Sequence, residues 1–143
     1  PAYLLAKFKN EGVEIVKEPG DDEVMKKYPV DFVSFSYYMS SCSAASSEGL
    51  DTAVGNTVTA VKNPYLPSSE WGWQIDPIGL RITMNEIYYR YNLPILISEN
   101  GFGANDILTV DNQIHDEYRI KYLQKHINEL KKAIELDGVI CLG

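Results

Sequence analysis

One short apolar run constrains the fold of this chain more than any other feature. The run Ile95–Ile97 is uninterrupted, and Ser98 separates it from Glu99. Such a run indicates a strand buried on both faces, as in parallel sheets. In a barrel of parallel strands, the C-terminal strand ends carry the catalytic groups. Glu99 is therefore the first candidate for a catalytic residue, the alternative being a solvated residue that opens a loop, and Asn100 is expected to fix that loop.

The rest of the chain alternates predicted helices and strands, which indicates an α/β fold with a parallel sheet. Asp76 and Pro77 form a predicted N-cap and first turn. Five aliphatic residues in the last helix recur at helical spacing and form an apolar stripe. Helices are predicted at Ala2–Asn10, between Gly20 and Pro29, at Ile78–Tyr91 and at Ile114–Leu136; strands at Asp31–Ser40, Ile95–Ile97 and Val139–Leu142; and a long loop or hairpin at Ser41–Lys62. The stripe consists of Ile120, Leu123, Ile127, Leu130 and Ile134.

Composition excludes several classes of protein. The 143 residues are 45% hydrophobic and 23% charged, which is sufficient for one globular domain. The net charge of −7 disfavours nucleic acid as a partner, because phosphate binding needs a basic surface. No apolar run approaches the length of a membrane-spanning helix. The chain lacks a signal pattern but begins with Pro1, which leaves open whether the natural N-terminus is present.

The cysteines and histidines give no indication of a metal site. Cys42 and Cys141 lie far apart, without the spacing of metal ligands. We interpret both as buried or half-buried thiols, consistent with a reducing compartment. His115 and His126 are interpreted as structural. No metal or other cofactor is therefore expected.

Four segments of the sequence match motifs of one known protein family. Ile97–Gly101 (ISENG) resembles the nucleophile signature [IV]-[TS]-E-N-G, and Asp31–Tyr38 (DFVSFSYY) resembles the sixth-strand motif D-F-[LVI]-G-[IL]-N-Y-Y. Gly72–Arg81 is similar to the motif G-W-E-I-x-P-x-G-L, and His115–Leu123 to the motif D-x-x-R-x-x-Y-L of the seventh helix. In these four segments together, the sequence resembles glycoside hydrolase family 1. The resemblance implies part of a (β/α)8 TIM barrel, a fold of about 250 residues. Residues 1–143 would be a single incomplete segment of that catalytic domain, with the sixth strand, the seventh and the start of the eighth.

Two departures from the sixth-strand motif point to one branch of the family. Ser34 and Ser36 stand where glycine and asparagine are usual, as in the 6-phospho-β-glucosidase branch. The resemblance implies a retaining enzyme that hydrolyses 6-phospho-β-D-glucosides to glucose 6-phosphate and an aglycone, in the cytoplasm. A family 1 β-glucosidase or β-galactosidase without phosphate preference remains an alternative, as does a non-catalytic barrel protein.

The resemblance also implies roles for individual residues. Glu99 corresponds to the nucleophile, and Tyr38 to a tyrosine whose hydroxyl contacts it. Trp73 matches a tryptophan that flanks the leaving group, the alternative being loop packing. Ser36 is predicted on the same barrel face as Tyr38, since strand side chains alternate, where it either bonds near the sugar or fills space. Trp71 is interpreted as structural.

One part of the family's machinery has no counterpart in this sequence. The general acid of the family lies in an N-E-P motif, and Asn85-Glu86 is followed by Ile87 instead. Glu86 falls inside a predicted helix and is expected to be solvated. The phosphate-holding residues of the branch follow the eighth strand, after the last residue of this chain. We therefore expect the 143 residues alone to be inactive, and to self-associate or pair with the missing part of the barrel through their open strand edges.

Overall fold

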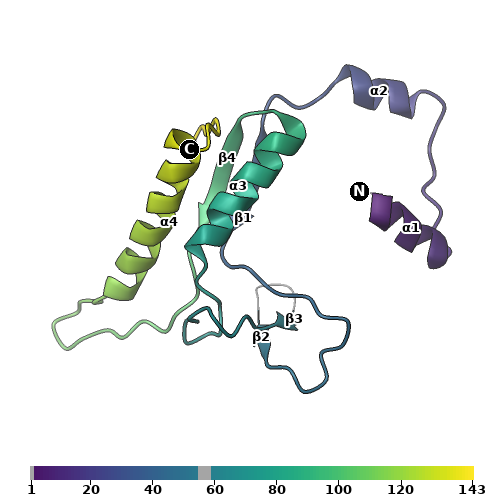
Figure 1. The fold of residues 1–143 in the computed structure, drawn as a ribbon. Helices are drawn as coiled ribbons and strands as arrows, with labels where there is room; N and C mark the ends of the chain where they lie inside the picture. The colour runs from purple at the N-terminus through teal and green to yellow at the C-terminus, as the bar shows by residue number, and fades with distance from the viewer. Residues whose placement is uncertain (1, 55–58) are drawn as a thin grey trace. The chain divides into compact units, whose positions relative to one another are not determined.

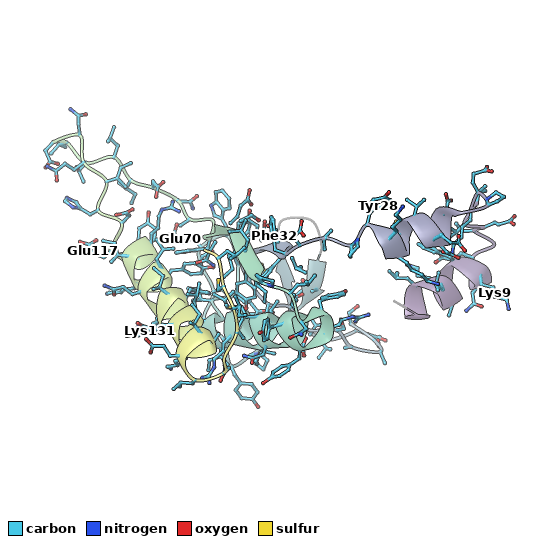
Figure 2. All side chains as sticks on the ribbon, turned by 90° about the horizontal axis from the view of Figure 1, so that it is seen from above. Lys9, Tyr28, Phe32, Glu70, Glu117 and Lys131 are labelled. Carbon is cyan, nitrogen blue, oxygen red and sulfur yellow. The ribbon has the colours of Figure 1, made fainter. Side chains whose placement is uncertain are left out.

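The computed structural model describes residues 2–54 and 59–143 and divides the chain into two compact units, Pro1–Val30 and Asp31–Gly143 (Figure 1). The first unit contains α1 (Ala2–Asn10) and α2 (Asp21–Lys27), which confirms both predicted helices. Gly12 follows α1 with a φ of +70°, a left-handed conformation that suits glycine. None of the side chains described in this unit is buried, and Figure 2 shows Lys9 and Tyr28 among them.

The second unit is built on parallel pairing of β1 (Val33–Tyr37) with β4 (Ile95–Asn100). On the opposite edge of β4, Ile95 forms a parallel bridge with Cys141, and the Ile95 amide donates to the Ile140 carbonyl at 2.9 Å. Three parallel segments thus follow one another in chain order, separated by helices, as the sequence predicts. The first strand is shorter than the predicted Asp31–Ser40, and the last segment forms a bridge rather than a full strand.

A small hairpin lies within the predicted loop or hairpin at 41–62. β2 (Thr52–Val54) pairs antiparallel with β3 (Thr59–Val61), and residues 55–58, which connect them, lie outside the described residues. Cys42 bridges to Val61 at the edge of this hairpin.

The helix α3 (Pro77–Tyr91) begins and ends as the sequence predicts. The Asp76 carboxylate accepts a hydrogen bond from the Gly79 amide at 2.9 Å, which satisfies an otherwise free donor of the first turn. Asn92 closes the helix with a φ of +51°, a conformation that asparagine tolerates.

The helix α4 (Glu117–Glu135) starts three residues later than predicted. Ile114 is occupied in an antiparallel bridge to Leu108, and Asp116 takes the N-cap position. The apolar stripe of α4 is not its buried face: Ile120, Leu123, Ile127 and Ile134 are 40–57% exposed, and only Leu130 packs against the core. The buried residues of α4 are Tyr122, His126 and Ala133.

The core of this unit lies between the sheet and the two long helices. It joins Leu80 and Met84 of α3, Tyr37 and Ile95 of the strands, Ala133 of α4, and Val139 in the segment after α4. The two helices also pack on each other.

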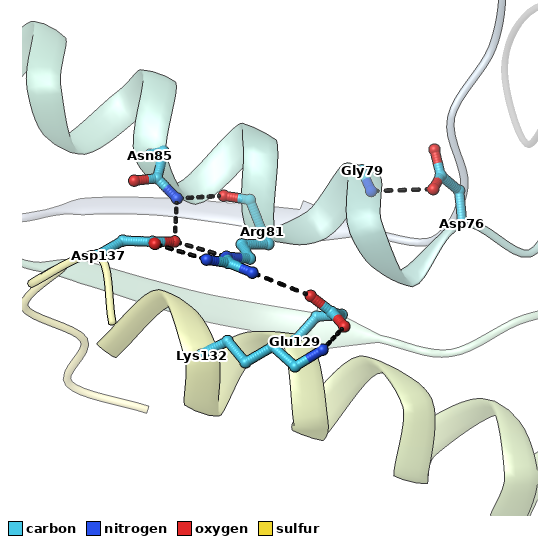
Figure 3. A network of polar contacts seen from close by, with 7 residues as sticks. All are labelled: Asp76, Gly79, Arg81, Asn85, Glu129, Lys132 and Asp137. Carbon is cyan, nitrogen blue, oxygen red and sulfur yellow. Dashed lines mark hydrogen bonds and ion pairs between the residues drawn. The ribbon is translucent and has the colours of Figure 1, made fainter. Parts of the chain in front are cut away.

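A polar network fastens α3 to the end of α4 (Figure 3). The Arg81 guanidinium donates two hydrogen bonds to the Asp137 carboxylate, both 2.6 Å long, and lies 3.7 Å from Glu129. Asn85 donates to the same carboxylate at 2.8 Å. These bonds, that from Arg81 above all, lower the pKa of Asp137 to about 2. The network therefore fixes the turn that leads into the third strand segment.

Candidate active site

Glu99 lies at the C-terminal end of β4, where the sequence predicts it. The register pairs Phe35 with Ile97 and then Ser36 with Glu99, so that Ser98 is an extra residue in a β-bulge. In a bulge of this kind, two successive residues oppose one residue of the partner strand, which re-aims their side chains. Without the bulge, Glu99 would lie opposite Tyr37, whose side chain is buried in the core. The bulge instead leaves Glu99 exposed at the strand end.

Tyr38 contacts Glu99 directly, as predicted. Its hydroxyl donates a hydrogen bond to the Glu99 carboxylate. Tyr38 is half-buried and lies one residue beyond β1, while Glu99 is the fifth residue of β4. This hydrogen bond holds one oxygen of the carboxylate in place.

Ser36 lies beside this pair. Its hydroxyl oxygen is 3.3 Å from that of Ser98, within hydrogen-bonding distance, and both residues are exposed. Ser34, two residues earlier, is exposed on the same face of β1, whereas the intervening Phe35 packs against the core. Ser34 and Ser36, the two serines that differ from the sixth-strand motif, thus lie on the face of the sheet that carries Glu99.

Asn100 ties the end of β4 to β1. Its side-chain amide donates to the Tyr37 carbonyl at 2.8 Å. Because Asn100 immediately follows Glu99, this bond restrains the backbone at the carboxylate. Asn100 therefore fixes the end of β4, and its predicted role in the loop that follows stays a prediction.

Two tryptophans extend the site away from Glu99. The Trp73 ring lies 5.6 Å from the Tyr38 ring, and Trp71 meets Trp73 edge to face at 6.1 Å. Trp71 is predicted to be a structural residue, yet it is 52% exposed and lines a cavity together with Tyr38 and Trp73. The cavity measures about 440 Å³ and is also lined by Gly101, Phe102, Gly103, Ala104, Asp106 and Arg119.

The wall of this cavity after β4 is held by a set of polar contacts. Arg119 donates to the Phe102 carbonyl at 3.1 Å and to the Asp106 carboxylate at 2.7 Å. Tyr118 also donates to Asp106, and these two donors lower the pKa of that carboxyl. The Trp71 indole N–H donates to the Asn105 side chain at 2.9 Å. The loop after β4 is therefore held both by residues of α4 and by Trp71.

The remaining candidates lie where the sequence places them. His126 is 1% exposed and its Nδ1 lies 2.8 Å from the Tyr122 carbonyl, so it is a core residue, and burial lowers its pKa. Glu86 is exposed on α3, and both cysteines are free thiols of intermediate exposure. Within residues 2–54 and 59–143, no group of three His, Cys, Asp or Glu side chains could hold a metal ion. No described helix combines the length and apolar character needed to cross a membrane.

This arrangement suits a nucleophilic role for one carboxylate. Glu99 stands at the end of a parallel strand, is oriented by a hydroxyl donor, and lies next to an aromatic-walled cavity. Flat aromatic rings of this kind pack well against apolar faces of sugars and aryl groups.

Comparison with known proteins indicates, along the whole chain, the same family as the sequence motifs. The model of glycosyl hydrolase family 1 matches residues 1–143. The chain is 49% identical over 143 residues to the 6-phospho-beta-glucosidase AscB of Escherichia coli, and 47% identical over 146 residues to the aryl-phospho-beta-D-glucosidase BglA of Bacillus subtilis. Each alignment covers all of this chain but only 30% of the relative, so the chain spans about a third of the length of these proteins.

Solved structures agree on the fold. The family 1 β-glucosidase of Thermotoga maritima in complex with isofagomine lactam superposes with a TM-score of 0.69 at 28% identity, over 97% of this chain and 29% of that one. Family 1 β-glucosidases are (β/α)8 barrels, so the α/β segment seen here is part of such a barrel, as predicted. The chain belongs to glycosyl hydrolase family 1.

Proposed function

We propose that the whole protein is a retaining β-glycosidase that hydrolyses 6-phospho-β-D-glucosides to glucose 6-phosphate and an aglycone. The observation that carries the proposal is the contact between Tyr38 and Glu99 at the end of β4, beside the aromatic-walled cavity. The family membership of residues 1–143 supports the reaction type.

In the proposed reaction, Glu99 is the nucleophile. Its carboxylate attacks the anomeric carbon and displaces the aglycone oxygen, which gives a covalent glycosyl-enzyme. A second carboxyl group, about 5–5.5 Å away in retaining enzymes, protonates the leaving oxygen and then activates water. We infer that this general acid belongs to a part of the protein outside these 143 residues, because the sequence contains no N-E-P motif.

The other predicted site residues take supporting roles. Tyr38 holds one oxygen of Glu99, which leaves the other oxygen directed at the sugar. Trp73 and the cavity beside it receive the leaving group, since the Trp73 ring lies against the Tyr38 ring and both residues line that cavity. Ser36 pairs with Glu99 across the two strands and is exposed, which supports a role for its hydroxyl in hydrogen bonding the sugar.

The phosphate preference rests on the relatives. The proteins AscB and BglA, named as phospho-β-glucosidases, are 47–49% identical to this chain along its whole length. The β-glucosidase A of Thermotoga maritima, whose name does not mention a phosphorylated substrate, is 29% identical to this chain. A phosphorylated substrate arises during phosphorylating sugar uptake, and on that ground we also propose a cytoplasmic location.

The proposal is tested with the full-length protein and a chromogenic β-glucoside, with and without the 6-phosphate. We expect a strong preference for the phosphorylated substrate, and loss of most turnover in the Glu99→Gln variant, since an amide cannot attack the anomeric carbon. Equal or reversed preference would refute the phosphate assignment alone. Near-normal turnover by Glu99→Gln would refute the nucleophile assignment.

The 143-residue chain by itself should behave differently from the whole protein. We propose that it is a single incomplete segment of the catalytic domain, inactive alone, and that it self-associates or pairs with the rest of the barrel. The exposed stripe of Ile120, Leu123, Ile127 and Ile134 on α4 supports this, because a contiguous apolar face of that kind favours association. Glycosidase turnover by the purified chain, or a sharp monomer in light scattering, would contradict it.

A further inference from the structure

Tyr122 is a buried residue of α4 for which the sequence analysis gives no role. It is 2% exposed. Its ring lies between Phe102, with ring centres 4.6 Å apart, and His126, with ring centres 3.9 Å apart and nearly parallel planes. Packing on both faces leaves this ring little freedom, so the position of its hydroxyl is set by the core.

The Tyr122 hydroxyl connects the two strand ends that carry the candidate site. It donates a hydrogen bond of 2.7 Å to the Tyr38 carbonyl and accepts one of 3.2 Å from the Asn100 side-chain amide. The same amide nitrogen donates to the Tyr37 carbonyl. Tyr37 and Asn100 are the last paired residues of β1 and β4, so these bonds continue the strand pairing just past the point where it ends.

The two residues held in this way are those on which the geometry of Glu99 depends. Tyr38 supplies the hydroxyl that meets the Glu99 carboxylate, and Asn100 is the next residue in the chain. Burial raises the pKa of Tyr122 to about 12, so its hydroxyl remains a donor at any working pH.

We propose that Tyr122 is a positioning residue that, through its hydroxyl, fixes Tyr38 and Asn100 on either side of the nucleophile Glu99. The proposal rests on the proposed function, in which Glu99 is the nucleophile. Tyr122 touches neither the substrate cavity nor the carboxylate itself. Its effect is transmitted by the Tyr38 backbone, whose displacement would move the Tyr38 hydroxyl relative to Glu99.

A second buried tyrosine provides a matched control. Tyr37 is 7% exposed, and its hydroxyl also donates to a backbone carbonyl, that of Asp76, at 2.8 Å. That bond anchors the N-cap of α3 and not the strand ends beside Glu99. Tyr37→Phe and Tyr122→Phe each remove one buried hydroxyl and keep the ring, so a general loss of stability affects both alike.

The experiment uses the full-length enzyme and four variants, Tyr122→Phe, Tyr37→Phe, Tyr38→Phe and the double variant of Tyr122 and Tyr38. Misplacement of a catalytic group by about 1 Å costs up to roughly 100-fold in rate. We therefore expect Tyr122→Phe to lower kcat by roughly 10-fold or more with KM nearly unchanged, and Tyr37→Phe to lower kcat by about 2-fold at most. In the Tyr38→Phe background, loss of the Tyr122 hydroxyl should cost little more, because the Tyr38 hydroxyl through which Tyr122 acts on Glu99 is already absent.

Two results would overturn the positioning role. One is a kcat of Tyr122→Phe equal to that of Tyr37→Phe, and the other is full multiplication of the two losses in the double variant. If Glu99→Gln is inactive in either case, the proposed function stands and only the role of Tyr122 falls. If Glu99→Gln keeps its turnover, both proposals fail.

Discussion

Gly103 is the position where a single added methyl group should have the clearest consequence. It is buried, and a Cβ placed there would lie 1.9 Å from Cε3 of the Trp71 ring. Carbon atoms in contact are separated by about 3.5 Å, so the indole or the loop must move by about 1.5 Å in the Gly103→Ala variant. The indole cannot move that far without straining its hydrogen bond to Asn105.

Three energies decide the size of this effect. Overpacking of a well-packed position costs about 1–3 kcal/mol, and loss of the Trp71–Asn105 hydrogen bond costs about 1 kcal/mol. Replacing glycine by alanine recovers about 0.4–1 kcal/mol, because the unfolded chain becomes less flexible. Trp71 is half-exposed and can swing towards solvent, which keeps the overpacking cost near its lower limit. We expect a net loss of about 1–2 kcal/mol in the free energy of unfolding.

Gly101→Ala is the matched control, two residues earlier in the same loop. Among the described residues other than its two chain neighbours, no atom lies within 4 Å of a Cβ added at Gly101, and its backbone does not need positive φ. Denaturant unfolding of the full-length protein, followed by tryptophan fluorescence, should show Gly103→Ala destabilised and its emission shifted as Trp71 becomes more exposed. Equal stability of the two variants, with unchanged emission, would refute this account of the contact.

Two further predictions concern Tyr38 and Asp137. The Tyr38→Phe variant loses a hydrogen bond to a charged group, which is worth about 1.5–3 kcal/mol. We therefore expect kcat to fall roughly 10- to 100-fold in steady-state kinetics. An unchanged kcat would contradict the importance of the contact. The Asp137 carboxyl has its pKa lowered from 3.8 to about 2, so its bonds to Arg81 stabilise the fold fully above about pH 4 and are lost as the pH falls towards 2. The Asp137→Asn variant should therefore have a lower free energy of unfolding than the natural protein at pH 7, and this difference in free energy should shrink below pH 4. A difference that does not change with pH in denaturant titrations would count against the ion pair.

Local signals predicted the elements that carry the site. Asp76 and Pro77 mark the start of α3 because a side-chain cap and a fixed φ act within one turn, and Asn92 marks its end for a similar local reason. The continuous apolar run predicted β4 and placed Glu99 at its end, because burial on both faces leaves no polar alternation. The contact with Tyr38 followed from the resemblance of the sixth-strand motif and not from any local pattern.

Features set by contacts between distant segments were not predictable in this way. The bulge at Ser98 depends on the register between β1 and β4, which neither strand encodes alone. The buried face of α4 carries Tyr122 and His126, whose polar atoms hide them from a search for aliphatic periodicity. Trp71 and Gly103 are distant in the sequence and meet at the wall of the cavity, so neither residue predicts the contact on its own.

Contacts from the start of α4 explain how this protein holds Glu99 in place on an exposed strand end. Arg119 and Tyr122 are three residues apart and therefore lie on one face of the helix. Arg119 donates a hydrogen bond to the Phe102 carbonyl, and the Tyr122 hydroxyl accepts one from the Asn100 side chain. The helix therefore contacts the chain at two points just after Glu99. The motif D-x-x-R-x-x-Y-L contributes no catalytic group of its own, yet its arginine and tyrosine fall at these two points. The accuracy with which Glu99 is placed therefore depends on the helix that follows its strand as much as on the strand itself.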